Sequence, residues 1–267
     1  MLRPGKIPSD SQIRKFIRHI IFGKNLFCPE CHSRRVASSQ GRYRCSSCRI
    51  RFSLLSHTWL ANLKIPLRQF WLVTWCYTAQ MPIKQASLVS ELSLKAVRFW
   101  YDTFRSNLPE NKVVLEHIVQ LDEAYFGGWK GKALLLAKQK GTRKLAYKVL
   151  NHTDPSRLDA WDFLKENIKP GSMLCTDGFS IYEGIEKLYP VTHVVDIHKS
   201  WEFGKTSEIE GMFGNLRTFI RRMYHHVTPK NLPEVVSEFC FRFSHPETFE
   251  NLRIFLTITL CLVPTGY

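Results

Sequence analysis

The chain has 267 residues, 44% of them hydrophobic, which is enough for a substantial core and about two domains. Lys and Arg number 38 against 23 Asp and Glu, so the formal net charge is +15 and the pI is about 9.6, which favours a polyanionic partner. The apolar runs fall short of the roughly 20 residues of a membrane span, and the opening residues lack a signal peptide's apolar stretch. We therefore expect a cytoplasmic protein without a membrane partner.

The first predicted element is an amphipathic helix over residues 10–22. Its apolar side chains recur at helical spacing, and Asp10 or Ser11 is expected to cap its start. The apolar stripe, which indicates packing rather than function, consists of Ile13, Phe16, Ile17, Ile20 and Ile21.

Two Cys-x-x-Cys pairs follow, with thirteen residues between them: Cys28 with Cys31, and Cys45 with Cys48. Each pair turns two thiolates toward one point, so the two pairs predict a tetrahedral site for structural zinc in a ribbon over residues 25–56. Disulfides or redox chemistry could use the same residues. The remaining cysteines lie in apolar surroundings that indicate free thiols in a reducing compartment: Cys76, Cys175, Cys240 and Cys261.

Arginines gather around the cysteine pairs and again near residue 220. A generic basic surface is the alternative to nucleic-acid binding, but this clustering favours DNA contact. The first cluster comprises Arg34, Arg35, Arg42, Arg44, Arg49 and Arg51, with Arg42 and Arg44 as DNA-binding candidates. The second comprises Arg217, Arg221 and Arg222, with the last two as DNA-binding candidates.

Residues 65–107 predict three helices: Leu67 to Ala79, Lys84 to Glu91, and a longer one that begins at Ser93. A short helix, a tight turn and a longer helix form the pattern of a helix-turn-helix. In that interpretation Ser93 caps the recognition helix, and Lys95 and Arg98 reach DNA. A plain three-helix packing unit is the alternative.

The composition changes after residue 112. Apolar runs predict strands over 113–122, 134–137, 145–150, 171–178 and 192–197, with helices over 156–167 and 207–224. With a further helix expected between the strands at 171–178 and 192–197, the order is three strands, a helix, a strand, a helix, a strand and a helix. This is the element order of an α/β, ribonuclease H-like domain, a mixed five-stranded sheet flanked by helices.

Two of these strands end in an acid, Asp122 and Asp177, and would be neighbours in such a sheet. Carboxylates that converge need a cation, and two Mg²⁺ or Mn²⁺ ions suit their oxygen ligands and support phosphoryl transfer. A third acid is expected from the helix over 207–224, where Glu208 and Glu210 compete. Glu210 lies two turns before Arg217, which aligns an acid with a phosphate-binding cation. The alternative is that these acids are caps and surface residues.

At this point the chain resembles the DDE transposases of bacterial insertion sequences that carry an N-terminal zinc ribbon, relatives of the eukaryotic Merlin elements. The resemblance covers about residues 25 to 250. The motifs that carry it are the two cysteine pairs, Asp-Glu-Ala-Tyr-Phe-Gly-Gly at 122–128, Thr-Asp-Gly at 176–178, His-Lys-Ser at 198–200, and Ile209-Glu210 followed by Phe213 and Leu216-Arg217.

The resemblance implies that Asp122, Asp177 and Glu210 bind two catalytic metal ions and that Arg217 positions phosphate. It places His198 near the active site, touching DNA or orienting an acid, although His198 can equally be an ordinary strand-end histidine. It also implies a nucleoid-associated bacterial enzyme that acts on double-stranded DNA, both the terminal inverted repeats and the target, as a homo-oligomer of at least two copies.

Five segments are expected. They are an N-terminal helix (1–24), the zinc ribbon (25–56), the helix-turn-helix region (57–110), the catalytic domain (111–230), and C-terminal helices that pack on the catalytic domain (231–267). Two other functions stay open: a DNA-binding regulator with an unused nuclease-like fold, and a structure-specific DNA nuclease.

Overall fold

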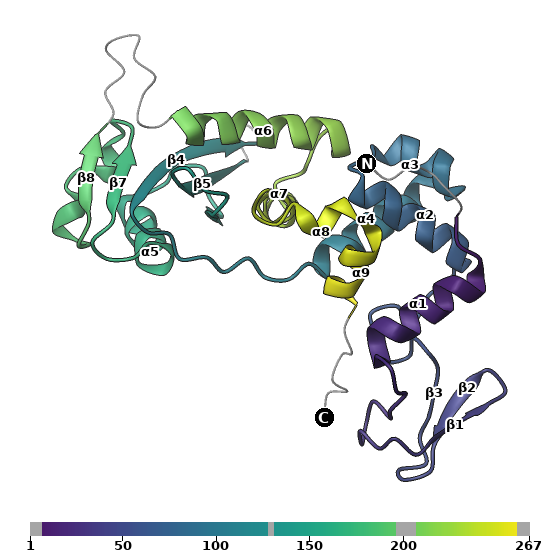
Figure 1. The fold of residues 1–267 in the computed structure, drawn as a ribbon. Coiled ribbons are helices and arrows are strands. Elements are labelled where there is room, and N and C mark those ends of the chain that lie inside the picture. Colours follow the sequence, from purple (N-terminus) through teal and green to yellow (C-terminus); the bar gives the residue numbers. More distant parts are fainter. Residues whose placement is uncertain (1–6, 128–130, 196–206, 261–267) are drawn as a thin grey trace. The chain divides into compact units, whose positions relative to one another are not determined.

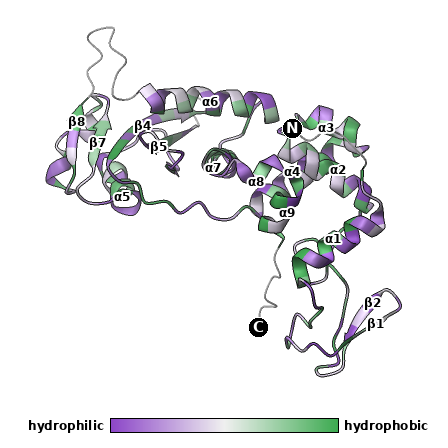
Figure 2. Cartoon of the chain, viewed as in Figure 1, coloured by the Kyte–Doolittle hydropathy of each residue, from purple (hydrophilic) through white to green (hydrophobic). Residues whose placement is uncertain are grey.

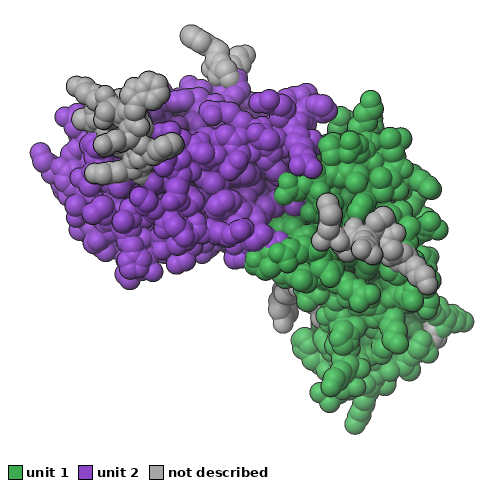
Figure 3. Space-filling view, turned by 45° about the horizontal axis from the view of Figure 1, so that its top comes forward, with its two compact units in different colours: residues 1–109, 247–267 green, residues 110–246 purple. Residues whose placement is uncertain are grey.

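The computed structural model describes residues 7–127, 131–195 and 207–260 (Figure 1). The chain divides into two compact units, one formed by residues 1–109 and 247–267 and the other by residues 110–246 (Figure 3). None of the helices in the described part combines the length and apolar character that a membrane crossing requires.

Unit 1 opens with helix α1 (Asp10–Phe22), which buries Ile13, Ile17 and Ile21. Its cap is Ser9, not Asp10 or Ser11 as the sequence suggested. The Ser9 hydroxyl accepts from the Gln12 amide at 3.4 Å, and the Gln12 side chain accepts from the Ser9 amide at 2.9 Å. Ser9 prevails because Gln12, three residues on, completes a reciprocal capping box.

The zinc-ribbon region contains a small antiparallel sheet in the order β1 (Val36–Ser39), β2 (Arg42–Cys45), β3 (Arg51–Phe52). The strands β1 and β2 form the hairpin that links the two cysteine pairs.

Three helices follow, α2 (Leu67–Thr78), α3 (Ile83–Ser90) and α4 (Leu94–Ser106). The turn between α3 and α4 is tight because Glu91 takes a left-handed conformation, with φ of 56°. Ser93 caps α4 by accepting from the Ala96 amide at 3.2 Å. The short helix, tight turn and longer helix of the predicted pattern are therefore present, and their role as a DNA-binding helix-turn-helix stays a prediction.

The end of the chain returns to unit 1 through α8 (Glu247–Glu250) and α9 (Leu252–Thr259). The Phe255 ring lies 5.6 Å from that of Tyr77 and 5.8 Å from that of Phe104, and the Trp59 indole donates to the Thr259 carbonyl at 2.8 Å. The expectation that all of 231–267 packs on the catalytic domain is wrong for these two helices, because their apolar faces complete the aromatic core of α2 and α4.

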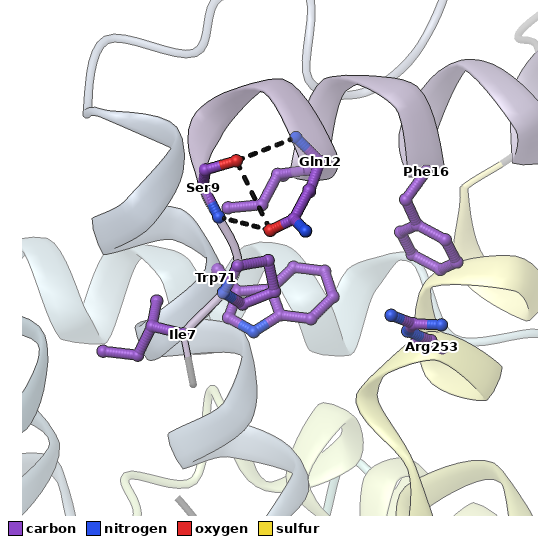
Figure 4. Close-up of a pocket in the computed structure, with 8 residues that line it drawn as sticks. Ile7, Ser9, Gln12, Phe16, Trp71 and Arg253 are labelled. Atoms are coloured by element: carbon purple, nitrogen blue, oxygen red, sulfur yellow. Dashed lines mark hydrogen bonds between the residues drawn. The ribbon is translucent and has the colours of Figure 1, made fainter. Parts of the chain in front are cut away.

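Helix α9 also faces α1. The Arg253 guanidinium lies 5.3 Å from the Phe16 ring centre, and Phe16 meets Trp71 edge to face at 5.8 Å. These three side chains and the α1 cap line a cavity of about 490 Å³ (Figure 4). Unit 1 is thus assembled from both ends of the described chain.

Unit 2 is built on a five-stranded sheet in the order β6-β5-β4-β7-β8. Its strands are β4 (Ile118–Phe126), β5 (Lys132–Gln139), β6 (Leu145–Val149), β7 (Met173–Thr176) and β8 (Thr192–Val195). The first three strands pair antiparallel, and β7 and β8 join them in parallel. This strand order and direction are those of a ribonuclease H-like fold, as the sequence predicts. The helix expected between the fourth and fifth strands is absent from the described chain, where two 3₁₀ turns, Ser180–Tyr182 and Ile185–Lys187, connect β7 to β8.

Helices cover both faces of this sheet. Helix α5 (Arg157–Asn167) packs Phe163 and Leu164 on the face that carries Val119 and Leu121. Helix α6 (Ser207–Tyr224) covers the opposite face, where the Ile209 amide donates to the Gln120 side chain at 3.1 Å. Apolar and hydrophilic residues alternate along α6 (Figure 2), as expected of a helix with one buried side. Helix α7 (Leu232–Ser244) packs against β6 and α6.

Strand β4 is shifted relative to the sequence expectation. It begins at Ile118 rather than residue 113, and Asp122 is its fifth residue rather than its last. His117 has a positive φ of 64°, which interrupts the extended chain just before the strand. Eight pairings with β5 then carry β4 on to Phe126.

Candidate active site and zinc ribbon

Asp122 and Asp177 come together where β4 and β7 separate. The parallel pairing of these strands ends at Gln120 and Cys175, so the two acids each lie two residues beyond the last pair. Both are half-buried, and together with Glu123 they bring carboxylate oxygens within 4.8 Å of one another. The strand register itself therefore creates a site of concentrated negative charge.

Glu123 is the acid that the sequence analysis missed. It follows Asp122 and accepts a hydrogen bond from the fully buried Tyr182 hydroxyl at 2.9 Å. Burial raises the pKa of the Glu123 carboxyl to about 7; the Tyr182 hydrogen bond opposes this change, and the charges of Asp122 and Asp177 add to it. The available signal was a second acid inside an otherwise apolar strand.

Asp177 is held by its own turn. Its Oδ1 accepts from the Phe179 amide at 3.0 Å, and the 3₁₀ turn that follows, Ser180–Tyr182, delivers Tyr182 to Glu123. The segment after β7 is thus tied to β4 beside the two aspartates.

The two helix acids lie on opposite flanks of α6. Glu208 pairs with Lys138 of β5 and accepts from the Gly141 amide at 3.3 Å, and these contacts lower its pKa. Ile209 faces the sheet, and residues two apart on a helix are about 200° apart. Because β5 and β7 lie on opposite sides of β4, Glu210 occupies the flank toward β7 and Asp177.

Glu210 is exposed on that flank. Among the described residues, two groups of metal-ligating side chains come within 4.8 Å, one of cysteines and one of acids, and Glu210 belongs to neither. Its place as the third acid stays a prediction.

Arg217 lies farther along α6, with its guanidinium carbon 5.8 Å from the Phe126 ring centre at the end of β4. It is exposed, as are Arg221 and Arg222. Seven and eleven residues separate Arg217 and Arg221 from Glu210, so all three share one flank of the helix. His198, the remaining predicted site residue of unit 2, lies outside the described residues.

The four cysteines form a second cluster, in unit 1. Their sulfur atoms all lie within 4.8 Å of one another, 3.5 Å separates the sulfurs of Cys28 and Cys48, and 3.6 Å those of Cys31 and Cys45. These four thiols are free, with no disulfide among them. Zn–S bonds of about 2.3 Å in a tetrahedron place sulfurs roughly 3.8 Å apart, so the cluster fits zinc.

The local fold prepares this cluster. The residue after each pair, His32 and Arg49, has a positive φ, of 55° and 65°, so both pairs end in the same tight turn. A hydrogen bond from the Cys48 backbone amide is the main cause that lowers the pKa of the Cys45 thiol to about 6. Burial raises the pKa of the Cys28 thiol, and for Cys48 the Ile50 amide is outweighed by burial and the neighbouring cysteines, which raise the pKa to about 12.

The other cysteines of the described chain stand apart from this cluster. Cys76, Cys175 and Cys240 are buried free thiols, as the sequence predicts, and burial raises the pKa of the Cys76 thiol to about 12. Cys261 lies outside the described residues.

The predicted DNA-contacting side chains of unit 1 are at its surface. Arg42 and Arg44 are exposed on β2, and Lys95 and Arg98 are exposed on the first two turns of α4.

Comparisons with known proteins agree with these two clusters. Residues 114–244 match the model of the ISXO2-like transposase domain, and residues 8–51 match that of the transposase zinc-ribbon domain. No curated protein sequence matches the chain.

Among solved structures, the catalytic core domain of BIV integrase is similar with a TM-score of 0.33 and 9% identity, over 48% of this chain and 82% of that one. A chain of the simian T-cell lymphotropic virus intasome in complex with PP2A regulatory subunit B56 gamma is similar with a TM-score of 0.35 and 9% identity, over 63% of this chain and 64% of that one.

The two family matches lie one after the other along the chain and together span more than half of it. The match to the transposase domain contains the acidic cluster and α6. The match to the zinc-ribbon domain contains α1 and all four clustered cysteines. The chain therefore belongs to the DDE transposases of insertion sequences that carry an N-terminal zinc ribbon.

Proposed function

We propose that the protein binds the terminal inverted repeats of a mobile element through unit 1 and cuts and joins DNA with unit 2. The observation that carries the proposal is the alignment of Asp122 and Asp177 at the fork between β4 and β7. Two converging carboxylates in a chain of net charge +15 are suited to metal-dependent phosphoryl transfer on DNA.

In this proposal Asp122 and Asp177 hold two divalent cations, Mg²⁺ or Mn²⁺, and Glu210 approaches from the β7 flank of α6. When bound, such ions activate the attacking oxygen and stabilise the leaving oxygen of an in-line displacement. The carboxylates fit these cations because hard oxygen ligands suit them. The carboxylates of Asp122, Glu123 and Asp177 also lie so close that they repel one another without a cation.

The reaction has two displacements. Water adds to the phosphorus at each element end, and the 3′-oxygen leaves with a proton. That 3′-hydroxyl then attacks a target phosphodiester, so the number of phosphodiester bonds is conserved in the joining step and no covalent protein–DNA bond forms. Arg217, two turns beyond Glu210, contacts a DNA phosphate near the acids.

In this proposal unit 1 recognises the DNA sequence of the terminal repeats. Lys95 and Arg98 lie exposed at the start of α4, the position from which a recognition helix reads the major groove. Arg42 and Arg44 of β2, with Arg221 and Arg222 of α6, contact phosphates. Two element ends require at least two copies of the chain on DNA.

The test uses the full-length protein, labelled duplexes from the DNA that flanks its coding region, and a supercoiled target plasmid with Mg²⁺. The expected products are 3′-hydroxyl ends and labelled end–target joints, both absent in Asp122→Asn and Asp177→Asn variants that still shift the duplex on a gel. Cleavage without joints would instead identify a structure-specific nuclease. Specific binding without cleavage would identify a regulator.

A further inference from the structure

A histidine whose side chain is largely buried lies one strand away from the acids. His193 is on β8, paired in register with Leu174 of β7, and its side chain is only 7% exposed. The reaction proposed above gives it no part. Burial of a polar ring costs free energy unless the ring is hydrogen-bonded, so the partners of His193 near Asp177 need to be identified.

The contacts of His193 lead to Asp177. His193 Nε2 lies 2.9 Å from the hydroxyl oxygen of the fully buried Thr176, and this hydroxyl donates to the Asp177 carbonyl at 2.8 Å. With the single Thr176 hydrogen placed on the Asp177 carbonyl, we assign the hydrogen between Nε2 and Thr176 to the imidazole. On its other side, Nδ1 faces a Glu186 carboxylate oxygen at 3.5 Å.

The carboxylate and the carbonyl of Asp177 are therefore fixed separately. The Phe179 amide holds the carboxylate at 3.0 Å, and Thr176 holds the carbonyl. Without the donor from His193, the Thr176 hydroxyl would need another partner for its acceptor position in a buried site, and its rotation would release the carbonyl. A small rotation of this peptide changes where the carboxylate lies relative to Asp122.

We propose that His193 is a positioning residue for Asp177, acting through Thr176, and that it sets the spacing of the acids for divalent metal. This inference rests on the proposed function, because it assigns a support to the same acids. His193 and Asp177 also line a common cavity of about 400 Å³, so a direct contact between the imidazole and DNA is the competing explanation.

The test compares matched variants of the full chain in the cleavage assay. The Mg²⁺ concentration is varied, with no other divalent cation present, and the rate of cleavage is measured at each concentration. His193→Gln keeps an N–H donor near the Nε2 position, His193→Asn keeps one near Nδ1, and His193→Leu keeps neither. At Thr176, Ser keeps the hydroxyl and Val removes it. We expect cleavage by His193→Leu, His193→Asn and Thr176→Val to fall about 10- to 100-fold and to need more Mg²⁺, as is usual when a metal ligand is deprived of its support.

His193→Gln and Thr176→Ser should stay close to the parent protein, and none of the variants should change the affinity for the terminal repeat. Because both residues act through one hydrogen bond, the His193→Leu/Thr176→Val double variant should be no worse than the poorer single variant. Thermal unfolding accompanies each assay to show that the variants are folded.

Equal activity of His193→Gln and His193→Asn would overturn the proposal, even if His193→Leu failed to fold. Additive effects in the double variant would show that the imidazole acts independently of Thr176, and a change in DNA affinity alone would favour direct contact with DNA. Failure of the proposed function is distinguishable, since Asp177→Asn would then also cleave.

Discussion

At the scale of single residues, Glu208 and Glu210 make the sharpest comparison. Glu210→Gln should abolish end cleavage and leave DNA binding intact, because it removes a carboxylate from the β7 flank of α6. Glu208→Gln should retain most cleavage, because Glu208 contacts Lys138 and Gly141 on the other flank. The measurement is Mg²⁺-dependent nicking of a labelled terminal repeat, with a gel shift as the binding control.

The reverse result, with Glu208→Gln inactive and Glu210→Gln active, would show that the wrong flank of α6 has been assigned. Asp122→Asn and Asp177→Asn serve as the inactive references. If all four variants cleave like the parent protein, the acids do not carry the chemistry.

Glu123 should make the stability of the metal-free protein depend on pH. Its folded-state pKa of about 7 lies above the ordinary value of 4.5. A raised carboxyl pKa gives stability that is fully present below about pH 4.5 and is lost as the pH rises through 7. The melting temperature of the parent should therefore fall more between pH 5.5 and pH 8 than that of Glu123→Gln, with no Mg²⁺ or Mn²⁺ added to either protein.

A steeper fall in Glu123→Gln than in the parent would contradict this assignment. Tyr182→Phe is the matched control, because it removes the hydroxyl that donates to Glu123 and leaves the buried ring. By removing the hydrogen bond that opposes the rise, it should raise the Glu123 pKa further.

The sequence singles out Asp122 and Asp177 because each places a charge at the end of an apolar run. The same reasoning does not identify Glu123 as a site residue, and the cause is physical. Alternation along a strand assigns neighbours to opposite faces, and only the long-range contact with Tyr182 shows where the Glu123 carboxylate lies. For the same reason His193 gives no sequence signal, since its partner Thr176 is on another strand.

At the scale of elements, the zinc ribbon should be folded by its metal. Cys45→Ser should bind well below one zinc per chain and unfold the ribbon, because metal binding supplies folding free energy in such modules. Elemental analysis and limited proteolysis of residues 25–56 are the measurements. Cys240→Ala, which removes a buried thiol outside the cluster, should keep one zinc per chain. Full DNA binding by zinc-free parent protein would contradict the structural role.

The glycine after β4 gives a second element-scale prediction. Gly127 has φ of +91°, and a Cβ there would lie 2.9 Å from Pro229 Cγ and 3.1 Å from Gly131 Cα. Gly127→Ala should therefore cost more than about 1 kcal/mol of unfolding free energy. Denaturant unfolding of the full chain measures it.

The control is Gly211→Ala in α6, where a Cβ meets nothing within 4 Å and φ is ordinary. Because alanine favours helix more than glycine does, Gly211→Ala should be neutral or stabilising by up to about 1 kcal/mol. Equal destabilisation of both variants would show that the close approach at Gly127 is unimportant.

Elements with local signals were predicted well. Helix α6 has the expected bounds, 207–224, because its apolar period is uninterrupted, and Ser93 caps α4 as expected. The predicted bounds or caps were wrong where a contact with another residue or strand determines them. Gln12 selects Ser9 as the cap of α1, and pairing with β5 extends β4 beyond Asp122.

At the scale of the whole molecule, charge should govern DNA affinity. With a net charge of +15, neutralisation of about six phosphates predicts a slope near −5 for log affinity against log salt. Fluorescence anisotropy with a terminal-repeat duplex between about 50 and 300 mM salt, the range over which such binding weakens steeply, measures the slope.

An Arg42→Ala/Arg44→Ala variant should lower the magnitude of that slope by about two, which is one unit for each phosphate that the variant leaves without its arginine. A slope near zero for the parent, or an unchanged slope in the variant, would contradict the binding of phosphates by β2.

The least predictable part of the fold was which segments of the chain make up each unit. Composition marks a boundary near residue 110, where unit 2 begins. Nothing local shows that α9 leaves unit 2 to join Trp59, 200 residues earlier in the chain, since its apolar face would fit any core. The sequence therefore assigned it to the domain that precedes it.

This return of α9 has a consequence for biosynthesis. Unit 2 is an insertion between two parts of unit 1, so a ribosome delivers every residue of the acidic site before it delivers the helix that completes the core around Tyr77 and Phe104. While translation continues, the nascent chain holds a complete unit 2 and an unfinished unit 1. A chain that stopped after residue 246 would therefore leave the core around Tyr77 and Phe104 uncovered, although every acid of the site would remain.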